Sequence, residues 1–193
     1  MGSKCIGIDI GGTTVKIGIF TTEGQLLEKW EVPTRKENNG NQILPDVAAS
    51  IEKKLQKMGI DKADVVGAGM GVPGPVLPDG SVEVCVNLGW KNANPQKELS
   101  GLLGGMLVRS GNDANVAALG EMWQGGGKGY RDIVMVTLGT GVGGGVIIDE
   151  KIIAGRHGLA GEIGHIHVRD EETEYCNCGG RGCLEQVASA TGI

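Results

Sequence analysis

The chain is poor in aromatic residues and has no excess of positive charge. Its 193 residues include only 3 Trp, 2 Tyr and 1 Phe, and 18 Lys and Arg stand against 23 Asp and Glu, for a formal net charge of −5. A face that binds nucleic acid usually shows as a basic excess, and none is present. The composition therefore predicts no nucleic-acid partner.

Long apolar segments are missing as well. No window of 18 or more apolar residues occurs, and the richest segment, residues 133–148, is interrupted by seven residues that are Thr or Gly. A membrane-spanning helix needs about 20 apolar residues, and no signal-peptide pattern opens the chain. We therefore expect a cytoplasmic protein with no membrane contact, whose 5 cysteines are free or metal-bound rather than paired in disulfides.

Glycine is the residue in excess. The chain has 36 glycines, whereas average usage would give about 13 or 14 in this length. An apolar fraction of 40% and a charged fraction of 21% are typical of a globular protein and exclude a fibrous or disordered one. The glycines are therefore expected in tight turns and in close backbone approaches, such as phosphate-binding loops.

Apolar periodicity predicts an α/β fold with a mixed sheet. In the first half it indicates strands and one helix, the strands over residues 5–10, 15–20, 26–32 and 65–70 and the helix over 44–58. In the second half the pattern repeats loosely, with strands over 107–109, 133–138, 142–148 and 151–153 and helices over 113–123 and from about 184.

Two lobes are expected, one over residues 1–124 and a partial one over 125–193, with a hinge near the glycines of 125–129. The second lobe shows hardly any helix to cover its strands. A sheet without such cover leaves one face in water. We therefore expect that another chain covers this face or that the chain is truncated.

Three glycine clusters are candidates for phosphate-binding loops. Residues 69–74 and 139–144 match G-x-G-x-x-G, but neither is followed by a helix as a dinucleotide site requires, and no P-loop pattern occurs. Residues 9–16 and 137–144 instead predict two hairpin turns made of small and hydroxyl residues. Successive backbone N–H groups in such turns form a concave anion site.

One such turn in each lobe predicts a grip on a polyphosphate from both sides, the alternative being two ordinary hairpin turns. Asp9, at the end of a strand, suits Mg²⁺ directly or through water. The candidate phosphate and cation residues are therefore Asp9, Gly11, Gly12, Thr13 and Lys16 in the first turn and Thr140 and Gly141 in the second.

Asp113 lies where a predicted strand meets a predicted helix. An Asp at this position is commonly a helix cap that accepts backbone N–H bonds. It also stands at the carboxyl end of a strand, where α/β proteins bind their ligands, and so it is a candidate base. The two roles are compatible, because a capping carboxylate has a second oxygen.

Three thiols fall within eight positions, at Cys176, Cys178 and Cys183. Either His165 or His167 would complete a closed, structural Cys₃His zinc site, and chance clustering or a redox pair is the alternative. Two carboxylates flank this cluster, Glu162 and Glu185, and are candidates for binding hydroxyl groups. Cys5 and Cys85 lie in apolar strands and are expected in the core.

Together these segments resemble the ROK family (repressors, open reading frames, kinases). The segments that carry the resemblance are DIGGTTVK (9–16), NLGW (87–90), NDANVAALGE (112–121), TLGTGVGGG (137–145), AGEIGH (160–165) and CNCGGRGCLE (176–185). The glycine loops are shared with the wider actin-like ATPase superfamily, whose ribonuclease H-like fold the resemblance implies. The combination of GEIGH with the cysteine segment is more specific.

The resemblance implies ATP- and Mg²⁺-dependent phosphorylation of a hexose at its 6-hydroxyl, a step of glycolysis, with glucose favoured over mannose, fructose and N-acetylmannosamine. It implies that Asp113 takes the hydroxyl proton and that Asn112, Glu162, His165 and Glu185 hold the other hydroxyls. It also implies zinc ligands at His165, Cys176, Cys178 and Cys183, so that His165 and not His167 binds the metal, and a homodimer.

Two alternatives from other functional classes stay open. Repressors of the family resemble this chain in the sugar site but carry a DNA-binding helix-turn-helix before the first glycine loop, and only eight residues precede Asp9 here. A regulator is therefore disfavoured. Family members also continue well past the cysteine segment, so a truncated chain that binds sugar without turnover is the other alternative.

Overall fold

The computed structural model describes residues 3–192 and contains two compact units, one up to Asp113 and one from Ala114 onward. This division falls at the first residue of helix α4 (Asp113–Gln124). The predicted lobe boundary lies at the other end of the same helix, after residue 124, and stays a prediction about domains.

A five-stranded mixed sheet forms the first unit, in the order β3-β2-β1-β4-β7. The pairs β1–β2 and β2–β3 are antiparallel, whereas β1–β4 and β4–β7 are parallel. This mixed arrangement confirms the prediction. The strand bounds are β1 (Lys4–Ile10), β2 (Thr14–Thr21), β3 (Leu26–Pro33), β4 (Val65–Val72) and β7 (Val108–Asn112).

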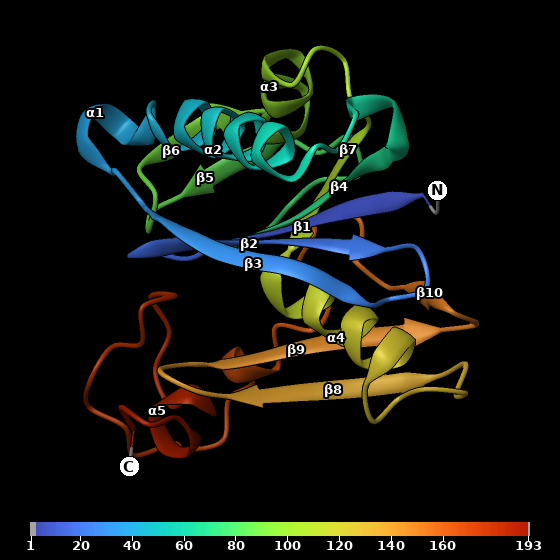
Figure 1. The fold of residues 1–193 in the computed structure, drawn as a ribbon. Coiled ribbons are helices and arrows are strands. Elements are labelled where there is room, and N and C mark those ends of the chain that lie inside the picture. Colours follow the sequence, from blue (N-terminus) through green and yellow to red (C-terminus); the bar gives the residue numbers. More distant parts are fainter. Residues whose placement is uncertain (1–2, 193) are drawn as a thin grey trace. The chain divides into compact units, whose positions relative to one another are not determined.

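Helices α2 (Ile43–Met58) and α3 (Pro95–Leu102) lie on one side of this sheet (Figure 1). The predicted helix over 44–58 is confirmed as α2, which ends at Gly59 in the left-handed conformation with φ of 64°. Glycine adopts this conformation without the steric cost of a Cβ. The core between sheet and helices includes Ile8, Ile17 and Ile51, each 3% exposed or less.

Residues 79–106 hold elements that the periodicity did not predict. They include the hairpin of β5 (Val82–Cys85) and β6 (Trp90–Ala93) and helix α3. The start of α3 carries a recognisable signal, because the Asn94 side chain accepts a hydrogen bond from the Lys97 N–H and Pro95 is the first helical residue. Two short helical turns complete this unit, α1 (Glu37–Gly40) and η1 (Lys62–Asp64).

The second unit contains most of α4 and a three-stranded antiparallel sheet in the order β10-β9-β8. Its strands are β8 (Ile133–Leu138), β9 (Val142–Ile148) and β10 (Lys151–Ile152), which confirms three predicted strands. Helix α4 packs closely on β9, since a Cβ added at Gly145 would lie 2.6 Å from the Ala118 Cβ. The remaining elements are short, η2 (Ile163–His165) and α5 (Glu185–Ala188).

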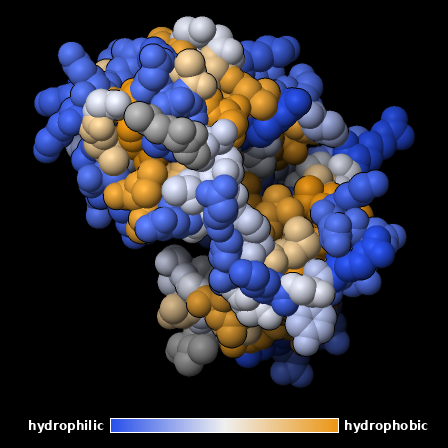
Figure 2. All heavy atoms as spheres, turned by 45° about the vertical axis from the view of Figure 1, so that its right-hand side comes forward, coloured by the Kyte–Doolittle hydropathy of each residue, from blue (hydrophilic) through white to orange (hydrophobic). Residues whose placement is uncertain are grey.

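Strand β8 is at the edge of this sheet and keeps one row of apolar side chains in water. Val134, Val136 and Leu138 are 67%, 51% and 69% exposed. Because these residues alternate with Met135, the partner of Gly145, they lie on the face of the sheet away from α4. In the view of Figure 2 apolar residues reach the surface in several patches among polar ones. Within residues 3–192, no helix is both long and apolar enough to cross a bilayer.

Candidate functional site

The first glycine turn joins β1 to β2 and is held from one side by Thr34. The Gly11 N–H donates to the Thr14 carbonyl at 3.1 Å, and a Cβ at Gly11 would lie only 2.7 Å from that same oxygen. Thr34, which is 8% exposed, donates its hydroxyl to the Gly11 carbonyl at 2.7 Å and its N–H to the Thr13 carbonyl at 2.9 Å. Two carbonyls of the turn are thereby fixed by one residue.

Asp9 and Lys16 are cross-strand partners next to this turn. Their neighbours Ile8 and Ile17 are also paired and point into the core. Because successive side chains of a strand alternate between faces, Asp9 and Lys16 project from the opposite face of the sheet. The Asp9 carboxylate and the Lys16 ammonium group therefore lie beside the turn, on the face of the sheet away from α2.

Asn112 and Asp113 come at the junction of β7 and α4. Asn112 is 9% exposed, and its Nδ2 donates to the Gly74 carbonyl at 3.2 Å. Asp113 is the first residue of α4, where the helix dipole favours a carboxylate. The amide of Asn112 thus ties the strand end to the turn that follows β4.

Cys85 holds the same turn from a second direction. Its Sγ donates to the Pro73 carbonyl at 2.9 Å, and burial raises the pKa of the thiol. A raised pKa keeps the sulfur protonated and therefore able to donate. The thiol is buried, as predicted, whereas that of Cys5 is only partly buried. Neither the Thr34 nor the Cys85 contact was predicted, because each joins residues that are distant in the sequence.

In the second unit, the glycine turn between β8 and β9 is bound by Glu185. The Gly139 N–H donates to the Gly141 carbonyl at 2.9 Å, and Glu185 Oε2 accepts the Val142 N–H at 3.0 Å. A side chain at Gly141 would collide with the Glu185 carboxylate. The Thr191 hydroxyl donates to the Thr140 carbonyl at 2.8 Å. Glu185, the first residue of α5, thus holds its carboxylate against the backbone of this turn.

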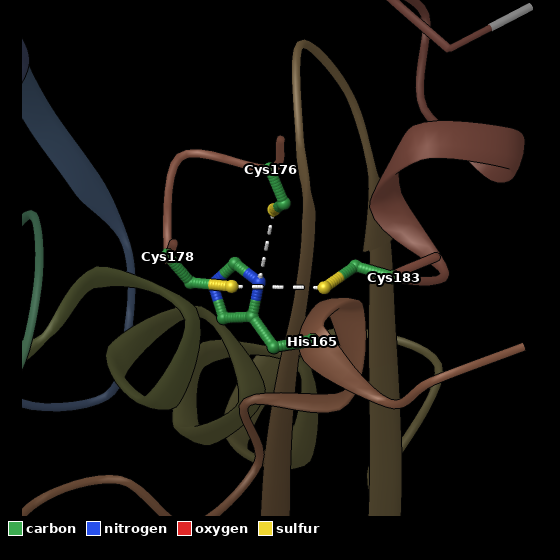
Figure 3. Close-up of side chains that lie close together, drawn as sticks. All are labelled: His165, Cys176, Cys178 and Cys183. Carbon is green, nitrogen blue, oxygen red and sulfur yellow. Dashed lines mark hydrogen bonds between the residues drawn. The ribbon is translucent and has the colours of Figure 1, made fainter. Parts of the chain in front are cut away.

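Four predicted metal ligands converge in the second unit, as Figure 3 shows. The ligand atoms of His165, Cys176, Cys178 and Cys183 all lie within 4.8 Å of one another. The His165 Nδ1 is 3.6 Å from the Cys176 Sγ, and the Cys178 and Cys183 sulfurs are also 3.6 Å apart. Residues from η2 and from the loop before α5 are brought to one point.

The two 3.6 Å distances fit ligands of a tetrahedral zinc ion. Zinc–sulfur bonds of about 2.3 Å and zinc–nitrogen bonds of about 2.0–2.1 Å separate neighbouring ligands by about 3.5–3.8 Å in a tetrahedron. Three thiols and one imidazole are a donor set that zinc prefers. Since four protein ligands close the coordination sphere, the metal would be structural.

The two histidines have different surroundings. His165 turns Nδ1 to the thiols, and its Nε2 is 3.9 Å from Glu162 Oε2. His167 has both ring nitrogens engaged, Nδ1 at 2.8 Å from the Arg181 carbonyl and Nε2 at 2.9 Å from Asp170 Oδ1. The geometry therefore selects His165 from the two histidines that the spacing left open.

The thiols differ in acidity before a metal binds. The Gly180 N–H, which donates to the Cys178 sulfur, lowers the pKa of that thiol, whereas burial raises the pKa of Cys183 to about 12. Zinc binds thiolates, so it must displace protons from this cluster.

The family model described as "ROK family" matches residues 5–193. The chain belongs to the ROK family. It is 46% identical over 189 residues to a glucokinase of Halalkalibacterium halodurans, covering 97% of this chain and 57% of the relative. It is 32% identical to a xylose repressor of Caldicellulosiruptor bescii, covering 95% of this chain and 46% of the relative.

Among solved structures, this ROK chain resembles a glucokinase of Streptomyces griseus in complex with glucose and AMPPNP. The TM-score is 0.82 at 36% identity, over 98% of this chain and 58% of that one. The fold is accordingly the actin-like ATPase fold of ROK sugar kinases, as predicted. The chain thus spans little more than half the length of its kinase relatives.

Replacing Cys176 with Ser should remove zinc binding, because a neutral hydroxyl is a poor substitute for a thiolate ligand. We expect metal analysis of purified protein to give about one zinc per wild-type chain and far less in the Cys176→Ser variant. Cys5→Ser is the matched control, since Cys5 lies outside the cluster. Equal zinc content in both variants would contradict a Cys₃His site.

Replacing Thr34 with Val keeps the side-chain shape but removes the hydroxyl that holds the Gly11 carbonyl. Leaving a buried acceptor without its donor costs about 1–3 kcal/mol. We expect faster hydrogen exchange of the Gly11 amide by NMR, while the Thr34→Ser control exchanges like wild type. Unchanged exchange in the Val variant would show that the hydroxyl does not hold the turn.

Proposed function

We propose that the whole protein is an ATP-dependent hexose kinase that phosphorylates glucose at its 6-hydroxyl. The observation that carries this proposal lies within the first unit. Asp9 lies near the end of β1, just before the glycine turn, and Asp113 directly follows β7; both strands run parallel to β4. Ligands of α/β sheets bind at the carboxyl ends of such strands. Similarity to glucokinases supports the assignment.

For the phosphates and Mg²⁺ we propose the backbone of both glycine turns together with two side chains. In the first unit these are Gly11, Gly12 and Thr13, with Asp9 and Lys16; in the second they are Thr140 and Gly141. The donor chemistry fits, because Mg²⁺ prefers carboxylate oxygen and phosphate oxygens pair with N–H groups and Lys. When bound, Mg²⁺ neutralises charge on the phosphates.

For the sugar we propose Asn112 and Asp113 from the first unit and Glu162, His165 and Glu185 from the second. Zinc would act on this set through His165, because a metal on Nδ1 fixes the orientation of the ring and directs Nε2 outward. Carboxylates and amides recognise hydroxyl groups, and a sugar lacking one leaves a buried polar group unpaired. This accounts for selection among hexoses.

In the proposed reaction the Asp113 carboxylate accepts the proton of the 6-hydroxyl. The sugar oxygen then forms a bond to the γ-phosphorus of ATP while the bond from that phosphorus to the β–γ bridging oxygen breaks. ADP leaves with the bridging electrons, and the proton is released from Asp113 to solvent. Most of the acceleration would come from positioning and charge neutralisation. We also propose that the whole protein is a cytoplasmic homodimer and that its reaction is a step of glycolysis.

Asp113→Asn removes the base while keeping the size of the side chain. In the whole protein we expect kcat to fall by about 10²–10⁴, the usual contribution of a general base. Glucose affinity should stay within about three-fold, because the Asn amide can still hydrogen-bond the sugar and the lost proton transfer acts in the transition state. Asp64→Asn is the control, because the Asp64 carboxylate lies at the surface, 3.9 Å from the Lys4 Nζ. We expect wild-type turnover in this variant. Retained turnover in Asp113→Asn would refute the assigned base.

Calorimetric titration of the 193-residue chain tests hexose recognition apart from catalysis. We expect glucose to bind with a Kd of about 1 μM to 1 mM and more tightly than mannose or fructose. A parallel titration with ATP separates the kinase from the two alternatives, a sugar-binding module and a sugar-sensing regulator. Similarity to a xylose repressor supports the regulator. If the whole protein binds sugar but does not bind ATP, the module or the regulator would be favoured over the kinase.

A further inference from the structure

Gly71 occupies the middle of a row that crosses three parallel strands. It pairs with Asp9 of β1 on one side and with Gly111 of β7 on the other. The next residue, Val72, pairs with Asn112, after which α4 begins at Asp113. Met70 and Val72 point into the core, so Gly71 faces the opposite side of the sheet, as Asp9 does.

A side chain at Gly71 would border both acidic residues. An added Cβ would lie 3.6 Å from the Asp113 Cα, 3.8 Å from the Ile8 carbonyl oxygen and 3.9 Å from Asp9 Oδ1. Each of these is an ordinary van der Waals contact. The φ angle of Gly71 is also outside the left-handed region. Neither steric overlap nor backbone conformation therefore excludes alanine at this position.

We propose that Gly71 is a spacing residue, whose missing side chain keeps open the volume that the transferring phosphoryl group occupies between Asp9 and Asp113. This inference rests on the proposed function. A methyl group is about as large as a water molecule, which takes roughly 30 Å³. Mg²⁺ keeps several waters or phosphate oxygens around a carboxylate ligand, and a methyl 3.9 Å from Asp9 Oδ1 would compete with them.

Gly69 offers a matched control on the same strand and the same sheet face. It pairs with Gly7 and Arg109, two positions before Gly71, and an added Cβ there would meet nothing within 4 Å. Gly69→Ala and Gly71→Ala therefore add the same methyl group to β4. They differ in whether that methyl stands beside Asp9 and Asp113.

The experiment compares wild type, Gly69→Ala and Gly71→Ala. Thermal unfolding and glucose calorimetry report on the fold and the sugar, titration of Mn²⁺ with inorganic tripolyphosphate reports on the phosphate and cation site, and turnover is measured in the whole protein. For Gly71→Ala we expect an unchanged Tm and glucose Kd, Mn²⁺–tripolyphosphate affinity weakened about ten-fold or more, and kcat lowered about 100-fold. Gly69→Ala should match wild type throughout.

Unchanged Mn²⁺–tripolyphosphate affinity and kcat in Gly71→Ala would overturn the spacing role. So would a fall in Tm together with loss of glucose binding, which would make Gly71 a structural residue, and so would a wild-type protein that binds no Mn²⁺–tripolyphosphate. A wild type that binds this probe but no hexose would refute the proposed sugar. In that case a ten-fold or greater loss of Mn²⁺–tripolyphosphate affinity in Gly71→Ala alone would still support the spacing role, and equal affinity would overturn it.

Discussion

The parallel register of β1, β4 and β7 is the constraint on which the first unit's chemistry depends. Parallel strands bring their carboxyl ends to one edge, and here the register sets Asp9, Gly71 and Gly111 in one row. A slip of one residue would turn Asp9 into the core and Ile8 out of it. The buried apolar residues of β1 and β2 therefore also determine the face of the sheet from which Asp9 projects.

Part of the excess of glycine is explained by positions where another part of the chain leaves no space for a Cβ. Gly11 has no space for a Cβ because the Thr14 carbonyl closes the turn, and Gly141 has none because the Glu185 carboxylate lies on it. Gly71 differs, because nothing in the protein itself forbids a methyl group there. Composition alone could not separate these cases, since all of them read as glycine in a loop or strand.

Local patterns predicted most of the regular structure, and long-range contacts were beyond them. Helix α2 and strands β8 and β9 follow directly from spacing of apolar residues. The hairpin β5–β6 does not, since its four-residue strands are too short for a period to stand out. Thr34 and Cys85 were missed for another reason. Their hydrogen bonds to Gly11 and Pro73 cross 23 and 12 residues.

The cysteine segment shows why a metal suits this part of the second unit. Residues 153–192 contain only η2 and α5 as helices among the described residues, and their buried apolar side chains are few. Such a segment has little hydrophobic burial to offset its conformational entropy. Four ligands supply a cross-link instead, and sequence could predict them because three lie within eight positions.

Selecting the fourth ligand required geometry: His165 turns Nδ1 to the thiols, whereas both nitrogens of His167 are engaged elsewhere. A zinc ion there would hold Glu162 and the ring of His165 in one short turn, so that a stabilising cross-link and the orientation of the proposed hydroxyl-binding groups become the same interaction.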